Sequence, residues 1–188
     1  MSYLFRTAKP TDAESLAEVH VESWNARYRG MLPDHLLENP ETGGQLGRWR
    51  RILTSDQPGR FILVAAQADE QVVGFVSAGA ARSTKLGFDS EIYAIYVASP
   101  YWRQRLGLRL MAAAAQRLQL FGHQDLMLWA LEDNTPARRF YERLGGAIVA
   151  ERIEKFNGEP LREIAYGWRK LSMLITICAE LPQSQPSA

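Results

Sequence analysis

The spacing of hydrophobic residues changes along the chain, and each change predicts the start of a new element. A short apolar run at 3–7 predicts a strand, and Thr11 or Asp12 can cap the helix that follows it. The pattern predicts that this helix continues to about Ala26 and that a second helical region ends near Leu53. The chain is therefore expected to begin with one strand and two helices.

The next part of the chain has the composition of strands. Aliphatic and aromatic residues fill three runs, at 61–67, 71–80 and 90–99, and the polar break between the first two predicts a hairpin. Alternation along the third run places the side chains of Ile92 and Ala94 on the same face. Three consecutive strands are therefore predicted.

Helical spacing returns at 105–121, where apolar residues recur every four positions from Leu106 to Leu118. A buried-type strand at 125–131, a short helix at 135–144 and two final strands follow. The predicted order is β-α-α-β-β-β-α-β-α-β-β. This order defines an α/β class of fold, an α+β mixed sheet with one parallel crossover.

The length of the chain suits a single domain. Its 188 residues lie within the usual roughly 100–200 residues per domain, and we predict that residues 1–170 form it. The tail, 171–188, is apolar up to residue 178 and then polar and rich in Pro and Ser, so its end is predicted to be disordered. The apolar part needs a cover from its own domain or from a partner, which makes a homodimer one expectation.

Composition and charge exclude several classes of function. With 22 basic and 21 acidic residues, the chain has no basic excess for nucleic acid. Its N-terminus lacks the apolar core of a signal peptide and no stretch resembles a membrane span, so we expect a cytoplasmic protein without membrane contact. The single cysteine and the three histidines lack the spacing of ligands, and no metal is predicted.

The stretch YWRQRLGLRLM, residues 101–111, places three arginines around one glycine where a strand gives way to a helix. A helix N-terminus exposes unpaired backbone N–H groups and carries partial positive charge, and both attract phosphate. Gly107 lets a ligand approach the backbone, and Arg103, Arg105 and Arg109 can add charge-assisted contacts. The stretch suits a pyrophosphate. On a simpler interpretation, Gly107 only eases the helix start and the arginines are solvated.

Extended to its neighbours, the stretch EIYAIYVASPYWRQRLGLRLM closely resembles the acetyl-CoA-binding motif of the GNAT acetyltransferase superfamily. In that motif a strand leads into a loop of the type Q/R-x-x-G-x-G/A and then a long helix. Trp102 stands at the Q/R position, Arg105 at the first glycine and Gly107 at the second. The later stretch LWALEDNTPARRFYERLGG resembles the family's second signature, and the resemblance spans residues 3–169. It implies the GNAT acyl-CoA N-acyltransferase fold, with acetyl-CoA as co-substrate.

The resemblance also implies where the cofactor binds. The predicted cofactor-binding residues are Tyr96, Val97, Arg103, Gln104, Arg105, Leu106, Gly107, Leu108, Asn134 and Tyr141. Main-chain groups of Tyr96 and Val97 would bond the pantetheine amides, whereas Asn134 either touches the pantetheine arm or only caps a helix. At Arg105 a right-handed backbone would keep the N–H for the pyrophosphate, but a positive φ would cost about 1 kcal/mol.

Acetyl transfer needs a neutral amine and a proton for the leaving thiolate. By resemblance, Tyr141 is the tyrosine whose hydroxyl points at the coenzyme A sulfur, although a packed helix residue would fit the same pattern. Glu91 begins a strand where family members often have a glutamate base, which acts directly or through water. Glu22, on the first helix, is its rival, and either carboxylate can instead be a solvated surface group.

The acceptor site is the least defined part of the sequence. Trp24, Tyr28 and His20 lie where the family builds its variable acceptor pocket, which suggests an aromatic wall for an amine. Core packing explains Trp24 equally well, and a lone histidine on an apolar face, such as His20, is more often structural. We predict transfer of an acetyl group to a primary amine of a small molecule, by direct attack in a ternary complex. A protein or peptide N-acetyltransferase and a catalytically silent acyl-CoA-binding module are the alternatives.

Overall fold

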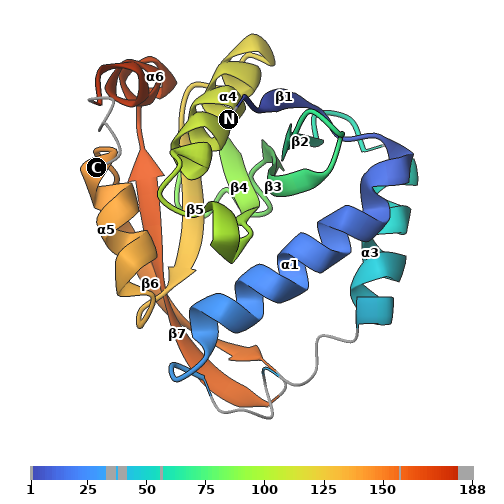
Figure 1. The fold of residues 1–188 in the computed structure, drawn as a ribbon. Coiled ribbons are helices and arrows are strands. Elements are labelled where there is room, and N and C mark those ends of the chain that lie inside the picture. Colours follow the sequence, from blue (N-terminus) through green and yellow to red (C-terminus); the bar gives the residue numbers. More distant parts are fainter. Residues whose placement is uncertain (1, 33–36, 38–41, 56, 157, 182–188) are drawn as a thin grey trace, which may run out of the picture.

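The computed structural model describes residues 2–32, 37, 42–55, 57–156 and 158–181, and its centre is a seven-stranded mixed sheet (Figure 1). The strands are β1 (Leu4–Thr7), β2 (Phe61–Ala66), β3 (Val72–Ala80), β4 (Ser90–Val97), β5 (Leu126–Leu131), β6 (Ala147–Phe156) and β7 (Glu159–Trp168). The α-helices are α1 (Ala13–Tyr28), α3 (Thr42–Thr54), α4 (Leu106–Leu120), α5 (Thr135–Arg143) and α6 (Leu171–Glu180). The predicted fold class and order of elements are confirmed, and α6 is an addition to them.

The sheet has the order β1-β2-β3-β4-β5-β7-β6, and β4 and β5 form its parallel pair. Their pairing is short, because only Glu91 with Met127 and Ile92 with Leu128 are in register. Beyond this point the two strands have no common ladder, although β4 continues to Val97. The sheet therefore opens at its centre, between the carboxyl ends of β4 and β5.

Helices cover both faces of the sheet. On one face, the apolar repeat of α4 from Leu106 to Leu118 is fully buried against β2, β3 and β4. On the other face, α1 and α3 enclose a second core around Leu16, Trp49 and Phe75. Figure 1 shows α1 and α3 together on one side of the sheet and α4 with α6 on the other.

A bulge interrupts β4 at Tyr93. Ser77 pairs with Ala94, but the next residue of β3, Ala78, pairs with Ile92. The extra residue reverses the alternation, so Ile92 packs into the core beneath α4 while Ala94 packs into the core beneath α1. The prediction that Ile92 and Ala94 share a face is wrong, because simple alternation assumes an unbroken ladder.

The apolar run after β7 forms α6, which packs against α4. Leu171, Leu174 and Cys178 are buried in the same core as the apolar face of α4. This chain itself covers the run, so the run gives no reason to expect a partner subunit. The predicted disorder at 182–188 lies outside the described residues.

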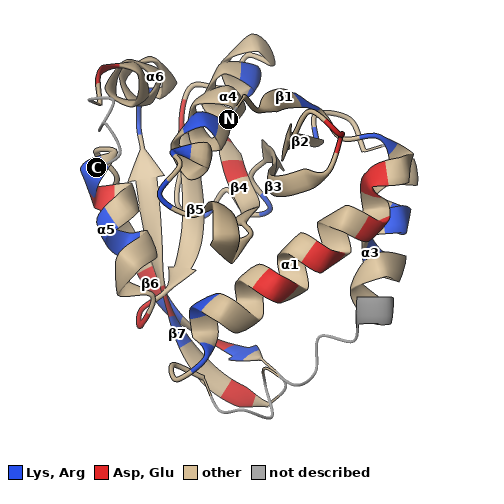
Figure 2. Cartoon of the chain, viewed as in Figure 1, with Lys and Arg blue, Asp and Glu red and all other residues tan. Residues whose placement is uncertain are grey.

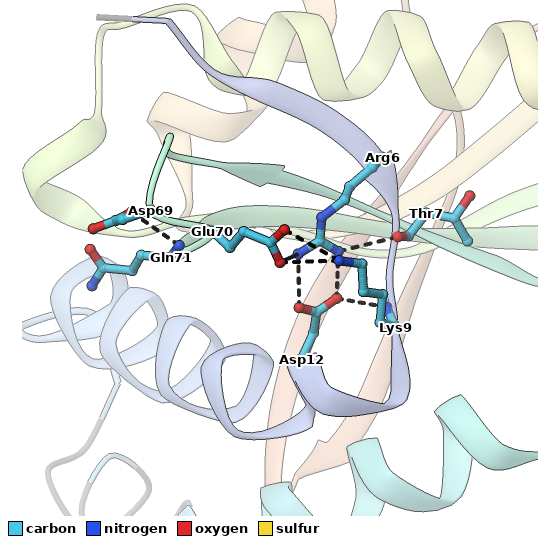
Figure 3. A network of polar contacts seen from close by, with 7 residues as sticks. All are labelled: Arg6, Thr7, Lys9, Asp12, Asp69, Glu70 and Gln71. Carbon is cyan, nitrogen blue, oxygen red and sulfur yellow. Dashed lines mark hydrogen bonds and ion pairs between the residues drawn. The ribbon is translucent and has the colours of Figure 1, made fainter.

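A polar network fastens β1 to the start of α1 (Figure 3). The Arg6 guanidinium donates two hydrogen bonds to the Asp12 carboxylate, at 2.7 and 3.0 Å, and the backbone N–H of Lys9 donates a third at 2.6 Å. Burial alone would raise the pKa of Asp12, but these hydrogen bonds outweigh it and the pKa lies below its usual value. The Lys9 ammonium also pairs with the exposed Glu70 at 3.0 Å.

Asp12→Asn is expected to lower the free energy of unfolding by about 2 kcal/mol at pH 7, because it removes the nearer of the two carboxylates that pair with Arg6. A carboxyl whose pKa is lowered by folding stabilises the fold above its unfolded pKa of about 4. That stabilisation is lost as the pH falls through the folded value. Urea unfolding should therefore give a difference between wild type and variant that shrinks below pH 4. Glu70→Gln is the control, with an expected effect of at most about 0.5 kcal/mol. A constant Asp12→Asn difference at all pH values would contradict this origin.

Candidate active site

A cavity of about 940 Å³ lies where β4 and β5 diverge. Residues 92–97 and 128–130 line it from the two strands, and the start of α4, one side of α5 and the end of α1 complete its wall. On the side that faces β5, β4 has no strand partner after Ile92 among the described residues. The backbone groups there can bond an extended ligand in the manner of an added strand.

The N-terminus of α4 opens into this cavity. The carbonyl of Arg105 accepts the first helical hydrogen bond from the N–H of Arg109 at 3.0 Å, so the N–H groups of 106–108 have no acceptor within the helix. Gly107 lines the cavity, and a Cβ built on it would meet no atom closer than Phe140 Cζ at 3.8 Å. Free N–H groups, partial positive charge and open space together fit a pyrophosphate.

The loop before α4 has an unusual backbone. Arg103 and Arg105 have φ of 61° and 63°, in the left-handed region that favours glycine. Of the two conformations that the sequence allowed at Arg105, the positive φ is the one observed, and it costs about 1 kcal/mol. The Arg105 guanidinium turns toward the end of α6, where Nη2 donates to the carbonyl oxygen of Leu181 at 2.7 Å.

Arginines give the cavity a strong positive charge. The four that line it are Arg27, Arg103, Arg105 and Arg143, and none of them forms an ion pair within the described part of the chain. Figure 2 shows basic positions at the start of α4 and along α5, whereas the visible face of α1 is mainly acidic. The Arg27 guanidinium lies 4.1 Å from the centre of the Trp102 ring, and burial lowers its pKa. A polyanion would supply the missing countercharge.

Trp102 bridges the strand and the loop. Its indole Nε1 donates to the carbonyl oxygen of Val97 at 2.6 Å, which fixes the indole at the cavity wall. One acceptor position of Val97 is thereby used, and a second lone pair remains on the same oxygen. The Tyr96 side chain stacks on His20, with ring centres 4.8 Å apart, so Tyr96 can meet a cavity ligand through its main chain.

Tyr141 lies on α5 with its ring buried at the cavity wall. The ring packs against Tyr166 and Trp168, with centres 5.7 and 6.2 Å away. Its hydroxyl has no hydrogen-bond partner among the residues that the structure describes. Burial raises the pKa of this phenol far above its usual value, so the hydroxyl is protonated at every physiological pH. The Tyr141 hydroxyl is thus an uncommitted hydrogen-bond donor on a residue of the cavity wall.

Asn134 caps α5 and lines the cavity at the same time. Its Oδ1 accepts the N–H of Ala137 at 3.3 Å, and its Nδ2 donates to the Tyr28 hydroxyl at 3.3 Å. The capping interpretation from the sequence therefore holds, and the same side chain also connects α5 to α1. Burial raises the pKa of Tyr28, which also lines the cavity.

The two candidate carboxylates both accept hydrogen bonds from other parts of the protein. Glu91 is only 3% exposed, and its carboxylate accepts hydrogen bonds from the backbone N–H and the guanidinium of Arg82. Glu22 accepts the backbone N–H of Ser99 at 2.9 Å and the hydroxyl of the same serine, and so ties α1 to the turn after β4. Neither carboxylate is part of the cavity wall.

An aromatic cluster lies at the end of α1 and reaches the cavity through Tyr28. The rings of Trp24 and Tyr28 lie 4.4 Å apart, and Trp24 also packs against Phe156 of β6 at 5.3 Å. Tyr28 reaches the cavity wall, whereas Trp24 lies behind it. Burial lowers the pKa of His20 to about 4, and this neutral histidine packs between Trp49 and Tyr96, outside the cavity.

The structure gathers most of the sequence-predicted site into one wall. The residues that line the cavity are Tyr28, Tyr96, Val97, Arg103, Arg105, Leu106, Gly107, Leu108, Asn134 and Tyr141. Gln104 is outside it, because its side chain accepts a hydrogen bond from the Tyr3 hydroxyl at 2.5 Å. Glu91 and Trp24 are also outside. Sequence reasoning missed Arg27, Phe140, Arg143 and Leu181 as wall residues, since no motif links them to the glycine loop.

The fold, the divergent central strands and the glycine-containing helix start define an acyl-CoA-binding transferase. The sequence matches the acetyltransferase (GNAT) family over residues 13–146, and the chain belongs to this family. It is 34% identical to the uncharacterized N-acetyltransferase YuaI of Bacillus subtilis strain 168, over 92% of this chain and 96% of the relative. It is 23% identical to spermidine N(1)-acetyltransferase of Thermoplasma acidophilum, over 77% of this chain and 88% of that protein.

A solved acetyltransferase structure has a similar fold. The PaiA N-acetyltransferase of Thermoplasma acidophilum in complex with coenzyme A superposes with a TM-score of 0.65 at 21% identity, over 89% of this chain and all of that one. Together with the family match and the 34% identical relative, this makes the protein an acetyl-CoA-dependent N-acetyltransferase. No helix within the described residues has the length and apolar character needed to cross a membrane.

Proposed function

We propose that the protein transfers the acetyl group of acetyl-CoA to a primary amine of a small molecule, by direct attack in a ternary complex. One observation carries the proposal: a single cavity joins the arginine-rich start of α4, the free Tyr141 hydroxyl and the aromatic end at Tyr28. At this end Trp24 packs against Phe156 and connects α1 to β6, and the aromatic wall at Tyr28 suits an amine acceptor.

In the proposed complex, the phosphates lie at the N-terminus of α4 and the pantetheine arm runs along the unpaired edge of β4. Acetyl-CoA supplies the activated thioester when it is bound. Tyr141 donates a hydrogen bond to the sulfur as negative charge develops there. Complete proton transfer is disfavoured, because the raised pKa makes the phenol a weaker acid than a thiol of pKa about 8.5.

The amine must lose a proton before it attacks, since its pKa is about 10.4 and only about one molecule in a thousand is neutral near pH 7. We assign this task to Glu91 acting through water. Its carboxylate lies outside the cavity wall, so direct contact with the amine is not part of the proposal. Glu91 sits on the strand that borders the thioester position, beside Ile92 and Tyr93 of the wall.

Glu91→Gln is expected to lower kcat about 100-fold, because the amide cannot accept the proton. Arg82→Gln is the matched control. It breaks the same ion pair but leaves the carboxylate in place, and we expect kcat to stay within about fivefold of wild type. Steady-state kinetics with a saturating amine measures both. Equal losses in the two variants would mean that the ion pair supports the fold of β4 and that Glu91 is not the base.

The acceptor class is tested by thiol release from acetyl-CoA in the presence of a panel of amines. The panel starts with polyamines, because one relative is a spermidine N(1)-acetyltransferase, and continues with monoamines, amino acids and short peptides with free N-termini. Turnover with small amines and none with peptides supports the proposal. The reverse result would establish the peptide N-acetyltransferase alternative, and binding of acetyl-CoA without turnover of any amine in the panel would contradict the small-molecule proposal.

A further inference from the structure

The C-terminal end of α6 forms part of the cofactor cavity. Leu181, the C-cap residue that follows α6, lines the cavity together with the loop before α4. The helix is held in place along its length, since Leu174 and Cys178 are buried against α4 and the end of α5 fits against it at Gly145. A Cβ on Gly145 would lie only 3.1 Å from Ile177 Cδ1. The family match ends at residue 146, so α6 is an element that the family motifs do not describe.

This placement creates an electrostatic problem. The last carbonyl groups of a helix lack intrahelical partners and carry partial negative charge. At the end of α6 they lie beside a cavity whose other wall is built to hold phosphates. Arg105 supplies both a donor for the helix end and positive charge for the phosphates. Its guanidinium donates to the Leu181 carbonyl at 2.7 Å, and its positive charge stays at the cavity.

The backbone conformation of Arg105 supports a structural role for its hydrogen bond to Leu181. Its φ of 63° is one that glycine adopts more readily than arginine, and glycine is the residue that the resembled motif has at this position. An arginine there accepts strain and gains a side chain that reaches α6. The main chain of the loop and the start of α4 remain at the cavity wall, with Gly107 beside them.

We propose that Arg105 is a positioning residue, which fastens the end of α6 to the phosphate-binding loop and holds both in the shape that binds acetyl-CoA. The side chain thus acts through Leu181 and the loop, and the phosphates bind to the N-terminus of α4 and to the other arginines of the cavity. The kinetic part of this inference rests on the proposed function, whereas binding and hydrogen exchange test it independently.

Arg105→Gln is expected to raise the KM for acetyl-CoA about tenfold and to leave kcat within about twofold, which corresponds to the loss of one hydrogen bond from a charged group. In the protein without ligand, the same variant should speed amide hydrogen exchange at residues 177–181. Arg103→Gln is the matched control: Arg103 lies in the same loop, lines the same cavity and has a similar φ of 61°, but among the described residues it donates no hydrogen bond to Leu181. Its exchange at 177–181 should equal that of wild type. Arg105→Lys, which keeps a donor, should recover most of the protection.

Arg105→Gly tests whether the arginine has this positioning role or is only a substitution of the motif glycine without effect on binding. Loss of the contact should raise the KM at least as much as Arg105→Gln does, although glycine relieves the strain. A KM at or below that of wild type in Arg105→Gly would overturn the proposal. So would a raised KM in Arg105→Gln with unchanged exchange at 177–181, because the guanidinium would then act on the phosphates directly. If no amine acceptor is found, calorimetric titration with coenzyme A replaces the KM, and the exchange measurement is unaffected.

Discussion

Tyr141→Phe is expected to lower kcat about 100-fold and to leave the KM for acetyl-CoA within about twofold, because the lost hydroxyl contacts the sulfur only as charge develops on it. The ring stays in place, since its packing against Tyr166 and Trp168 does not involve the hydroxyl. Burial raises the pKa of Tyr141, so the donor keeps its proton as the pH increases. The wild-type rate should accordingly show no alkaline decline from this group up to about pH 10.

Tyr166→Phe is the matched control for this prediction. Tyr166 packs directly against the Tyr141 ring. Its hydroxyl accepts a hydrogen bond from Arg138 and donates one to Glu142, and Tyr166 is not part of the cavity wall. Its removal should change stability by about 1 kcal/mol and kcat by less than about threefold. Stopped-flow or steady-state thiol release distinguishes the two variants. An unchanged kcat in Tyr141→Phe would remove Tyr141 from the mechanism and reduce it to a packed residue of α5.

Gly107→Glu is expected to weaken acetyl-CoA binding at least about 100-fold in calorimetric titration. The space beside Gly107 is open, so the protein can accommodate the side chain. The added carboxylate would lie where the N–H groups of 106–108 face the cavity and would repel the phosphates. Titration with 3′-dephospho-CoA shows whether the loss belongs to the pyrophosphate, because both ligands should lose affinity equally.

Gly107→Ala separates the effect of side-chain size on acetyl-CoA binding from the effect of the negative charge in Gly107→Glu. Its methyl group would meet Phe140 Cζ at the ordinary contact distance of 3.8 Å, and alanine in a helix is favoured over glycine by up to about 1 kcal/mol. We expect a higher melting temperature and a loss of affinity below about tenfold. If Gly107→Glu bound acetyl-CoA as tightly as Gly107→Ala does, the phosphates would have to lie elsewhere, and the assignment of the α4 N-terminus would be wrong.

The two variants also separate catalysis from binding. Gly107→Glu should act on the affinity for acetyl-CoA, whereas Tyr141→Phe should act on the rate of the bound complex. Because Tyr141 and Gly107 lie on different helices and act at different parts of the ligand, their effects should be nearly additive in free energy.

Local patterns were sufficient to predict most of the fold. The four-residue repeat from Leu106 to Leu118 predicts the buried face of α4, since helix periodicity depends only on neighbouring residues. The stretch RQRLG likewise places a phosphate-type site at a helix start, because a helix N-terminus has the same chemistry in any fold. The bulge at Tyr93 was not predictable, since it depends on how β3 and β4 pair across the sheet.

The sequence by itself determined the class of fold, the family motifs and the helix whose N-terminus we propose as the phosphate site. Only the tertiary structure decided which side chains share the cavity. It brings Arg27 and Leu181 to the wall from opposite ends of the chain, and it pairs Glu91 with Arg82. The physical reason is that periodicity and motifs encode short-range preferences. The shape and charge of a cavity depend instead on contacts between residues that are far apart in the sequence.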